Sequence, residues 1–103
     1  MNFDAVAGYS PIRIATAERR AAVLAPILTR EGTHHILFTR RADHLGEHPG
    51  QMSFPGGGAE PEDADLEATA LREADEEIGL RPEEVTTVGR LDEIEHGRPT
   101  AIF

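Results

Sequence analysis

The chain has 103 residues and a formal charge of −9, with 19 acidic residues against 10 basic ones, all of them arginine. A chain of this length is one domain at most and can bury only a modest core. Its acidic surface repels phosphate backbones, so we expect no nucleic-acid partner. There is no cysteine, no apolar run long enough to cross a bilayer and no signal-peptide pattern, so we expect a cytoplasmic protein without a membrane partner. The acidic, lysine-free composition fits adaptation to high salt and, equally, a codon bias towards arginine.

The N-terminal part predicts an arm followed by a β-hairpin. Residues 1–18 have mixed character, and we expect an irregular arm or a short edge strand. The run at 20–28 is apolar enough for a buried strand, although Pro26 favours an edge position or a bulge. Residues 30–33 have the composition of a turn, and residues 35–40 predict the returning strand of the hairpin.

A polar loop at 40–50 carries Arg41, whose planar guanidinium suits bidentate contact with phosphate oxygens. A salt bridge to one of the many carboxylates is the alternative. Histidines lie in this loop and just before it, namely His34, His35, His44 and His48. Adjacent residues on a strand point to opposite faces, so the pair at 34 and 35 is poorly placed to share one ion. We expect His34 and His35 to be surface residues near a turn, and His44 and His48 to have a structural or merely exposed role.

Three consecutive glycines precede the most charged part of the chain. Residues 51–54 predict a short strand leading to Pro55 and then to Gly56, Gly57 and Gly58. Glycine allows backbone angles closed to other residues and lets a bulky anion approach the main-chain amides. A tight turn that needs glycine for geometry alone is the alternative. The carboxylate-rich helix that follows favours a turn with a binding role.

An α-helix is predicted from Asp63, as N-cap, to Gly79, in the left-handed position that ends a helix. Spacings of three and four residues place four charged side chains on one face: Arg72, Glu73, Glu76 and Glu77. Roughly opposite lie Leu71, Ala74 and Ile78, which a sheet could cover. Three neighbouring glutamates repel one another, and a hard divalent cation such as Mg²⁺ or Mn²⁺ removes that conflict. Beyond the helix, residues 81–84 predict a loop and residues 85–91 a strand.

The helix carries a resemblance to a known family. Residues 72–80, READEEIGL, resemble the second half of the Nudix box, REUxEExGU, in which U is a bulky apolar residue. Gly58 takes the place of the first glycine of the box, whose span here is about 58–80. The box also asks for a glutamate at position 64, where this chain has Ala64, with Asp63 one place earlier.

A second motif resembles the signature of the coenzyme A pyrophosphatase-like branch of that family, LLTxR[SA]x3Rx3Gx3FPGG. The matching residues are Leu37, Phe38, Thr39, Arg41, Ala42, Gly50, Phe54, Pro55, Gly56 and Gly57. Gly46 stands where the signature has its second arginine. The resemblance covers about residues 37–80 and fades over 92–103. Because a whole Nudix fold is usually larger, the chain resembles a truncated domain.

The resemblance implies a single Nudix hydrolase domain over 1–103, with an N-terminal arm at 1–18. The implied fold is α/β (α+β), an α/β/α sandwich with a mixed sheet whose completeness at the C-terminus stays open. The implied reaction is metal-dependent hydrolysis of a nucleoside diphosphate linked to another moiety, with the pyrophosphate bond of coenzyme A or its derivatives as the first substrate. The alternatives are another nucleotide, such as ADP-ribose or a nucleoside triphosphate, and an inactive fragment that only binds nucleotide or a partner.

The same resemblance assigns roles to residues. The metal ligands for Mg²⁺ or Mn²⁺ are Glu73, Glu76 and Glu77, and Arg72 completes the catalytic set by orienting a glutamate through an ion pair. The substrate contacts are Arg41, Gly56, Gly57 and Gly58. The general base is left unassigned. A homodimer is one way to supply strands that the chain lacks, since exposed sheet edges invite pairing.

Overall fold

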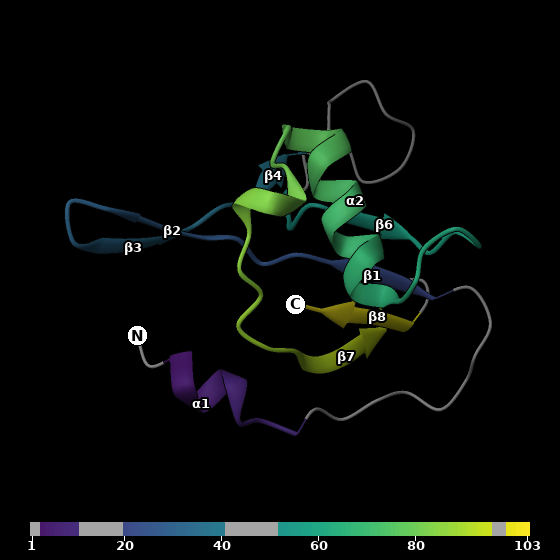
Figure 1. Ribbon diagram of the computed structural model, residues 1–103, viewed down its shortest axis with the longest axis horizontal. Helices are drawn as coiled ribbons and strands as arrows, with labels where there is room; N and C mark the ends of the chain where they lie inside the picture. The colour runs from purple at the N-terminus through teal and green to yellow at the C-terminus, as the bar shows by residue number, and fades with distance from the viewer. Residues whose placement is uncertain (1–2, 11–19, 41–51, 96–98) are drawn as a thin grey trace.

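A mixed four-stranded sheet covered by one long helix forms the centre of the computed structural model, which describes residues 3–10, 20–40, 52–95 and 99–103 (Figure 1). The strand order is β6-β1-β8-β7. Strand β1 pairs antiparallel with β6 and parallel with β8, and β8 pairs antiparallel with β7. The predicted α/β class with a mixed sheet is therefore confirmed. The bounds are β1 (Ala21–Val23), β6 (Gly56–Gly58), β7 (Leu91–Glu95), β8 (Pro99–Ile102) and α2 (Leu66–Ile78).

The core between α2 and the sheet is built mostly from alanine. Ala22 and Ala101 of the sheet and Ala70 and Ala74 of the helix form one buried cluster with Leu24. Small side chains let the helix lie close to the strands, and the larger apolar residues pack around this contact: Leu66, Leu71, Leu80, Val85 and Phe103. The predicted apolar face of the helix is confirmed, with Ala74 fully buried and Leu71 and Ile78 half-buried.

Helix α2 begins two residues later than predicted. Its N-cap is Asp65, whose Oδ1 accepts the Ala68 N–H at 2.8 Å. Asp63 was the wrong N-cap because its carboxylate is held by a side chain of the helix, as described below. The predicted end is confirmed, since Gly79 has φ 69° and donates its N–H to Asp75 O at 2.9 Å.

The predicted hairpin exists, but the strands that flank its turn are divided. Strand β2 (Ile27–Arg30) pairs with β3 (Thr33–Ile36) through a turn at Glu31 and Gly32, both with positive φ, and the hairpin projects from the body of the molecule (Figure 1). The predicted strand at 20–28 splits at Pro26, which has no N–H to donate. Beyond Ile36, the returning chain continues as β4 (Thr39–Arg40), paired with β5 (Met52–Ser53).

The glycine segment is a strand, and not the predicted glycine-rich turn. Gly56, Gly57 and Gly58 pair with Val23, Ala22 and Ala21 in strand β6. A side chain at Gly56 would collide with the Ala22 carbonyl oxygen and the Val23 backbone. Close approach of neighbouring strands therefore explains this glycine better than turn geometry does.

The C-terminal elements differ from the predicted ones. Residues 81–84 contain the 3₁₀ helix η1 (Pro82–Glu84), and the strand predicted at 85–91 begins only at Leu91. The Val85 N–H is used to close η1 onto Pro82 O at 3.1 Å, and Gly89 packs against the Val6 backbone, so this stretch connects the helix end to the sheet edge. Residues 99–102, where the resemblance fades, form the interior strand β8.

The predicted N-terminal arm contains the short helix α1 (Phe3–Ala7). Residues 11–19, where an edge strand was the alternative, lie outside the described residues. Among the helices that the structure describes, none has the length and hydrophobicity needed to span a membrane.

Candidate active site

Arg72 lies at the centre of a carboxylate cluster on α2. Its Nε and Nη2 donate to Oδ1 and Oδ2 of Asp63 at 2.9 and 3.0 Å. Its Nη1 donates to Glu73 Oε1 at 3.1 Å and makes longer contacts of 3.4 Å with both oxygens of Glu76. Nη2 also donates to the Gly58 carbonyl oxygen at 3.0 Å. Arg72 therefore ties the helix to strand β6 and to the loop between them.

The carboxylate of Asp63 is held on both oxygens. Besides Arg72, the Thr69 hydroxyl donates to Oδ2 at 2.8 Å and the Glu60 N–H donates to it at 3.0 Å. Thr69 is fully buried, and only 7% of the Asp63 side chain is exposed. The hydrogen bonds from Arg72 hold the pKa of Asp63 well below its ordinary value, with help from the Glu60 N–H. In turn, Asp63 raises the pKa of Arg72. Both groups therefore stay charged.

Glu73 lies directly over the glycine strand. A Cβ added at Gly57 would stand 2.6 Å from Cδ and Oε1 of Glu73, so the missing side chain leaves the space that this carboxylate fills. The Glu73 side chain is 17% exposed. The glycines and the glutamates are therefore related by packing, because the Glu73 carboxylate of α2 lies against the backbone of Gly57 in β6.

Glu76 and Glu77 extend the same face into solvent. The Glu76 side chain is 60% exposed, and Glu77 is exposed one residue later on the helix. Within the described parts of the chain, no three His, Asp or Glu side chains are gathered into a ready metal cage. The donor chemistry nevertheless fits a hard cation, because the three glutamates offer carboxylate oxygens on one helical face. The assignment of Glu73, Glu76 and Glu77 as ligands stays a prediction.

The comparison with known proteins decides the family. The model of the NUDIX domain matches residues 18–101, most of the chain. The chain belongs to the Nudix domain family. The match includes β8 and most of the C-terminal tail, so family similarity extends well beyond the box.

Two relatives of this Nudix chain carry the name "Uncharacterized Nudix hydrolase NudL", one from Yersinia pestis (strain Pestoides F) and one from Yersinia pseudotuberculosis serotype O:1b (strain IP 31758). Each is 53% identical over 78 residues, which are 75% of this chain and 38% of the relative. The chain therefore spans less than two-fifths of the length of these relatives. The crystal structure of the C. elegans Ap4A hydrolase matches 82% of this chain and 62% of its own, with a TM-score of 0.57 and 22% identity, which supports the fold alone.

The structure describes the predicted substrate glycines but neither Arg41 nor two of the histidines. Gly56, Gly57 and Gly58 lie in β6 beside the Nudix helix, and Gly58 contributes its carbonyl oxygen to Arg72. Arg41 lies outside the described residues, as do His44 and His48. His34 and His35 lie on the exposed strand β3, away from the carboxylates, and His34 Nδ1 lies 3.1 Å from the Thr29 hydroxyl.

Sequence reasoning missed three members of the Arg72 cluster, Glu60, Asp63 and Thr69. Asp63 was assigned to the helix N-cap, for which its position and chemistry were both suitable. The available signal was the family pattern, which asks for a carboxylate at position 64 and finds Ala64 there, one residue from Asp63. Only the late start of α2, at Leu66, leaves Asp63 on a loop that can turn back to Arg72.

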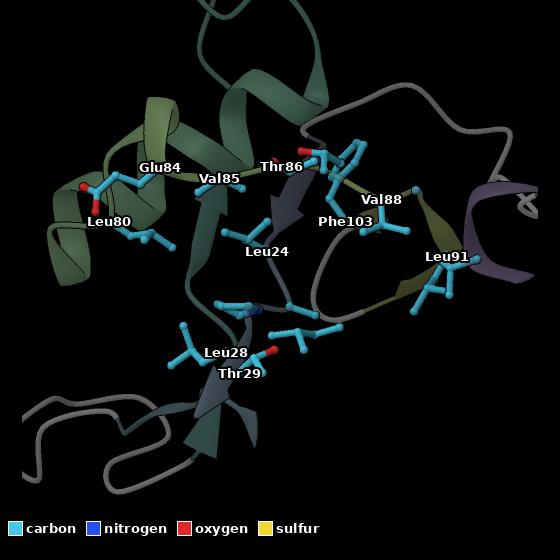
Figure 2. Close-up of a pocket in the computed structure, with 16 residues that line it drawn as sticks. Leu24, Leu28, Thr29, Leu80, Glu84, Val85, Thr86, Val88, Leu91 and Phe103 are labelled. Atoms are coloured by element: carbon cyan, nitrogen blue, oxygen red, sulfur yellow. The ribbon is translucent and has the colours of Figure 1, made fainter. Parts of the chain in front are cut away.

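A large pocket lined by described residues lies apart from the carboxylates. Its volume is about 530 Å³, and it lies between the end of α2, the connection to β7 and the chain leaving β1 (Figure 2). Leu24, Val85 and Phe103 line it, and Glu84 is the one charged residue among the described residues of its lining. No glutamate of α2 is among the residues that line this pocket, so we assign no part of the phosphate chemistry to it.

A second buried cluster holds the sheet together. Glu93 of β7 has a fully buried side chain, which accepts from Arg20 Nη1 at 2.5 Å and from Arg90 Nη2 at 2.8 Å. The Arg90 guanidinium lies 5.2 Å from the centre of the Phe103 ring. Since Arg20 directly precedes β1, this cluster connects the strand next to the glycines with the edge strand β7.

Proposed function

We propose that this chain carries the catalytic helix of a metal-dependent pyrophosphohydrolase. The substrate class is a nucleoside diphosphate linked to another moiety, and coenzyme A or one of its derivatives is the first substrate to test. The observation that carries the proposal is the Arg72 cluster: an arginine that reaches Glu73 and Glu76 from the same helix, above glycines that leave room for the carboxylate. Membership of the Nudix family supports the reaction class.

The proposed cofactor is Mg²⁺ or Mn²⁺, held by carboxylate oxygens of Glu73, Glu76 and Glu77. When bound, such an ion neutralises diphosphate charge and lowers the pKa of bound water. The role of Arg72 is to orient Glu73, which it contacts at 3.1 Å. Gly57 leaves the space that this carboxylate fills. The reaction breaks a bridging P–O bond, and water supplies the new oxygen on phosphorus.

The choice of coenzyme A comes from the branch signature at 37–57 and from the similarity to proteins named NudL. Arg41 is the proposed phosphate contact in that signature. The cytoplasmic location and the homodimer also stay predictions. A homodimer would show as a doubled molar mass of the purified chain by light scattering, and a monomer would contradict it.

The function is tested by incubating the purified chain with coenzyme A and Mg²⁺ or Mn²⁺, in low and in molar KCl, and separating the products. We expect release of 3′,5′-ADP and 4′-phosphopantetheine. Glu77→Gln should lower the rate about a hundredfold or more, because it removes a proposed metal ligand worth several kcal/mol in the transition state. Asp75→Asn is the matched control, since it removes an exposed carboxylate from the same helix.

The remaining outcomes select among the alternatives. Metal-dependent cleavage of ADP-ribose or a nucleoside triphosphate, without cleavage of coenzyme A, would replace the substrate but keep the reaction. A folded chain that cleaves none of the three would contradict the proposed activity. A chain that binds nucleotide without turnover would favour a binding role.

A further inference from the structure

Asp63 is the most firmly held carboxylate of the cluster, although it was not among the predicted site residues. It receives four hydrogen bonds: two from Arg72, one from the Thr69 hydroxyl and one from the Glu60 N–H. Thr69 also donates to Asp65 O at 3.2 Å, which fixes its own hydroxyl. The position of Asp63 is therefore determined by the loop and the helix together.

The contact with Asp63 divides the nitrogen donors of Arg72 into two groups, one directed to the loop and β6 and the other to the glutamates of α2. Nε and Nη2 face Asp63 and the Gly58 carbonyl oxygen, while Nη1 alone reaches Glu73 and Glu76. A guanidinium presents its strongest interaction when two nitrogens meet two carboxylate oxygens side by side. Asp63 receives that two-point contact, so Glu73 receives only a one-point contact.

The contact with Asp63 keeps the two-point face of the guanidinium away from the glutamates. If Arg72 were not occupied by Asp63, its two-point face would be available to Glu73 or Glu76. The same carboxylate oxygens that we propose as metal donors would then be engaged by the guanidinium. Arginine and a divalent cation would compete for one set of oxygens, and metal affinity would fall.

We propose that Asp63 is a positioning residue for the metal site, which holds Arg72 by a two-point contact so that Glu73 is oriented but stays available to a divalent cation. The inference rests on the proposed function of the glutamates. It also assigns a carboxylate to the role that the family pattern places at position 64, where Ala64 is exposed in this chain.

A purely structural role for Asp63 makes a different prediction. A loop anchor would affect the melting temperature of the metal-free chain and leave the affinity for metal unchanged in the folded protein. A positioning residue changes the affinity itself. Direct Mn²⁺ binding, followed by electron paramagnetic resonance of the free ion, separates the two without requiring turnover.

The experiment is a Mn²⁺ titration of the purified chain and of four variants: Asp63→Asn, Asp63→Glu, Asp65→Asn and Arg72→Gln. We expect Asp63→Asn to raise the dissociation constant about tenfold, the lower end of the range for residues that orient metal ligands. Asp63→Glu keeps the charge and should recover part of the loss. Asp65→Asn removes a charge from the same loop but not from Arg72, and should stay within about twofold of wild type.

The path through Arg72 is tested by adding Asp63→Asn to the Arg72→Gln variant. We expect the double variant to have the same dissociation constant for Mn²⁺ as Arg72→Gln alone, because without the guanidinium there is nothing for Asp63 to position. An additional tenfold loss would overturn the inference. If Asp63→Asn does not fold, Asp63→Glu takes its place, because the longer side chain keeps the charge while displacing the two-point contact with Arg72. Wild-type affinity in the folded Asp63→Glu variant would then overturn the inference.

Failure of this inference can be told apart from failure of the proposed function. If wild type binds Mn²⁺ and Glu73→Gln weakens it, the glutamate site stands, and an unchanged affinity in Asp63→Asn overturns the positioning role alone. If wild type binds no Mn²⁺ at millimolar concentration, the proposed metal site is wrong and the role of Asp63 is overturned with it.

Discussion

Gly57 and Glu73 occupy one space: a Cβ on Gly57 would stand 2.6 Å from Glu73 Oε1. The glycine is in β6 and the glutamate in α2, so the contact crosses from the sheet to the helix. The atoms that would collide belong to the far end of a flexible side chain. A substitution at Gly57 should therefore displace the carboxylate more than the backbone.

Gly57→Ala is the first prediction. We expect it to lower the metal-dependent rate about tenfold by moving Glu73, which corresponds to about 1.4 kcal/mol in the barrier. Its melting temperature should change little. Gly32→Ala is the contrasting variant: Gly32 has φ 78° with open space around it, so this change should cost about 1 kcal/mol of stability and leave the rate unchanged. Equal rates for wild type and Gly57→Ala would contradict the packing role.

Asp65 caps α2, because its Oδ1 accepts the Ala68 N–H at 2.8 Å. Asp65→Ala should destabilise the chain by about 1 kcal/mol, which for a domain of this size lowers the melting temperature by roughly 4–8 °C. Asp65→Asn keeps an oxygen that can accept the same hydrogen bond, and its melting temperature should remain near that of wild type. Circular dichroism at 222 nm measures both. A normal melting temperature for Asp65→Ala would show that the cap contributes little.

The pKa of Asp63, lowered in the folded state, predicts acid sensitivity. Because the folded chain holds this carboxylate ionised, its stabilising contribution is complete above the ordinary aspartate pKa of about 3.9 and is lost as the pH falls towards the lower folded value. The difference in melting temperature between wild type and Asp63→Asn should therefore be largest near pH 7 and shrink below about pH 4. A difference that grows at low pH would contradict the pairing with Arg72.

The buried ion pairs of Glu93 predict a large structural effect. Glu93→Gln leaves Arg20 and Arg90 without their shared carboxylate in a buried position, and we expect a loss of about 3 kcal/mol in urea unfolding. The matched control is Glu83→Gln, which breaks an exposed pair with Arg81 at 3.4 Å and should cost less than about 1 kcal/mol. Similar losses in the two variants would show that the Glu93 cluster does not stabilise the sheet.

The sequence predicted the local features of the site and not its long-range contacts. The spacing of Arg72, Glu73 and Glu76 determines their common face, and Gly79 closes the helix as its conformational freedom predicts. The partner of Arg72 could not be found in this way. Asp63 lies nine residues earlier, beyond the spacing at which helical side chains meet, and reaches Arg72 only because the helix starts at Leu66.

The strands show the same limit. Three glycines predict a turn from composition, yet pairing with β1 makes them a strand, because the neighbouring backbone leaves no room for a side chain at Gly56. Residues 99–102 have no distinctive pattern, but they fill the place between β1 and β7. Both strands form because of the segments that become their neighbours in space, and the residues within each segment do not reveal those neighbours.

The most direct test of the central claim is the rate of coenzyme A hydrolysis as a function of Mn²⁺ concentration, for wild type and Glu73→Gln at equal protein concentration. We predict a rate that rises with Mn²⁺ and saturates in wild type, is abolished by a chelator, and falls about a hundredfold or more in the folded variant. Equal rates in the two proteins at saturating Mn²⁺ would contradict a metal site built on the carboxylates of α2.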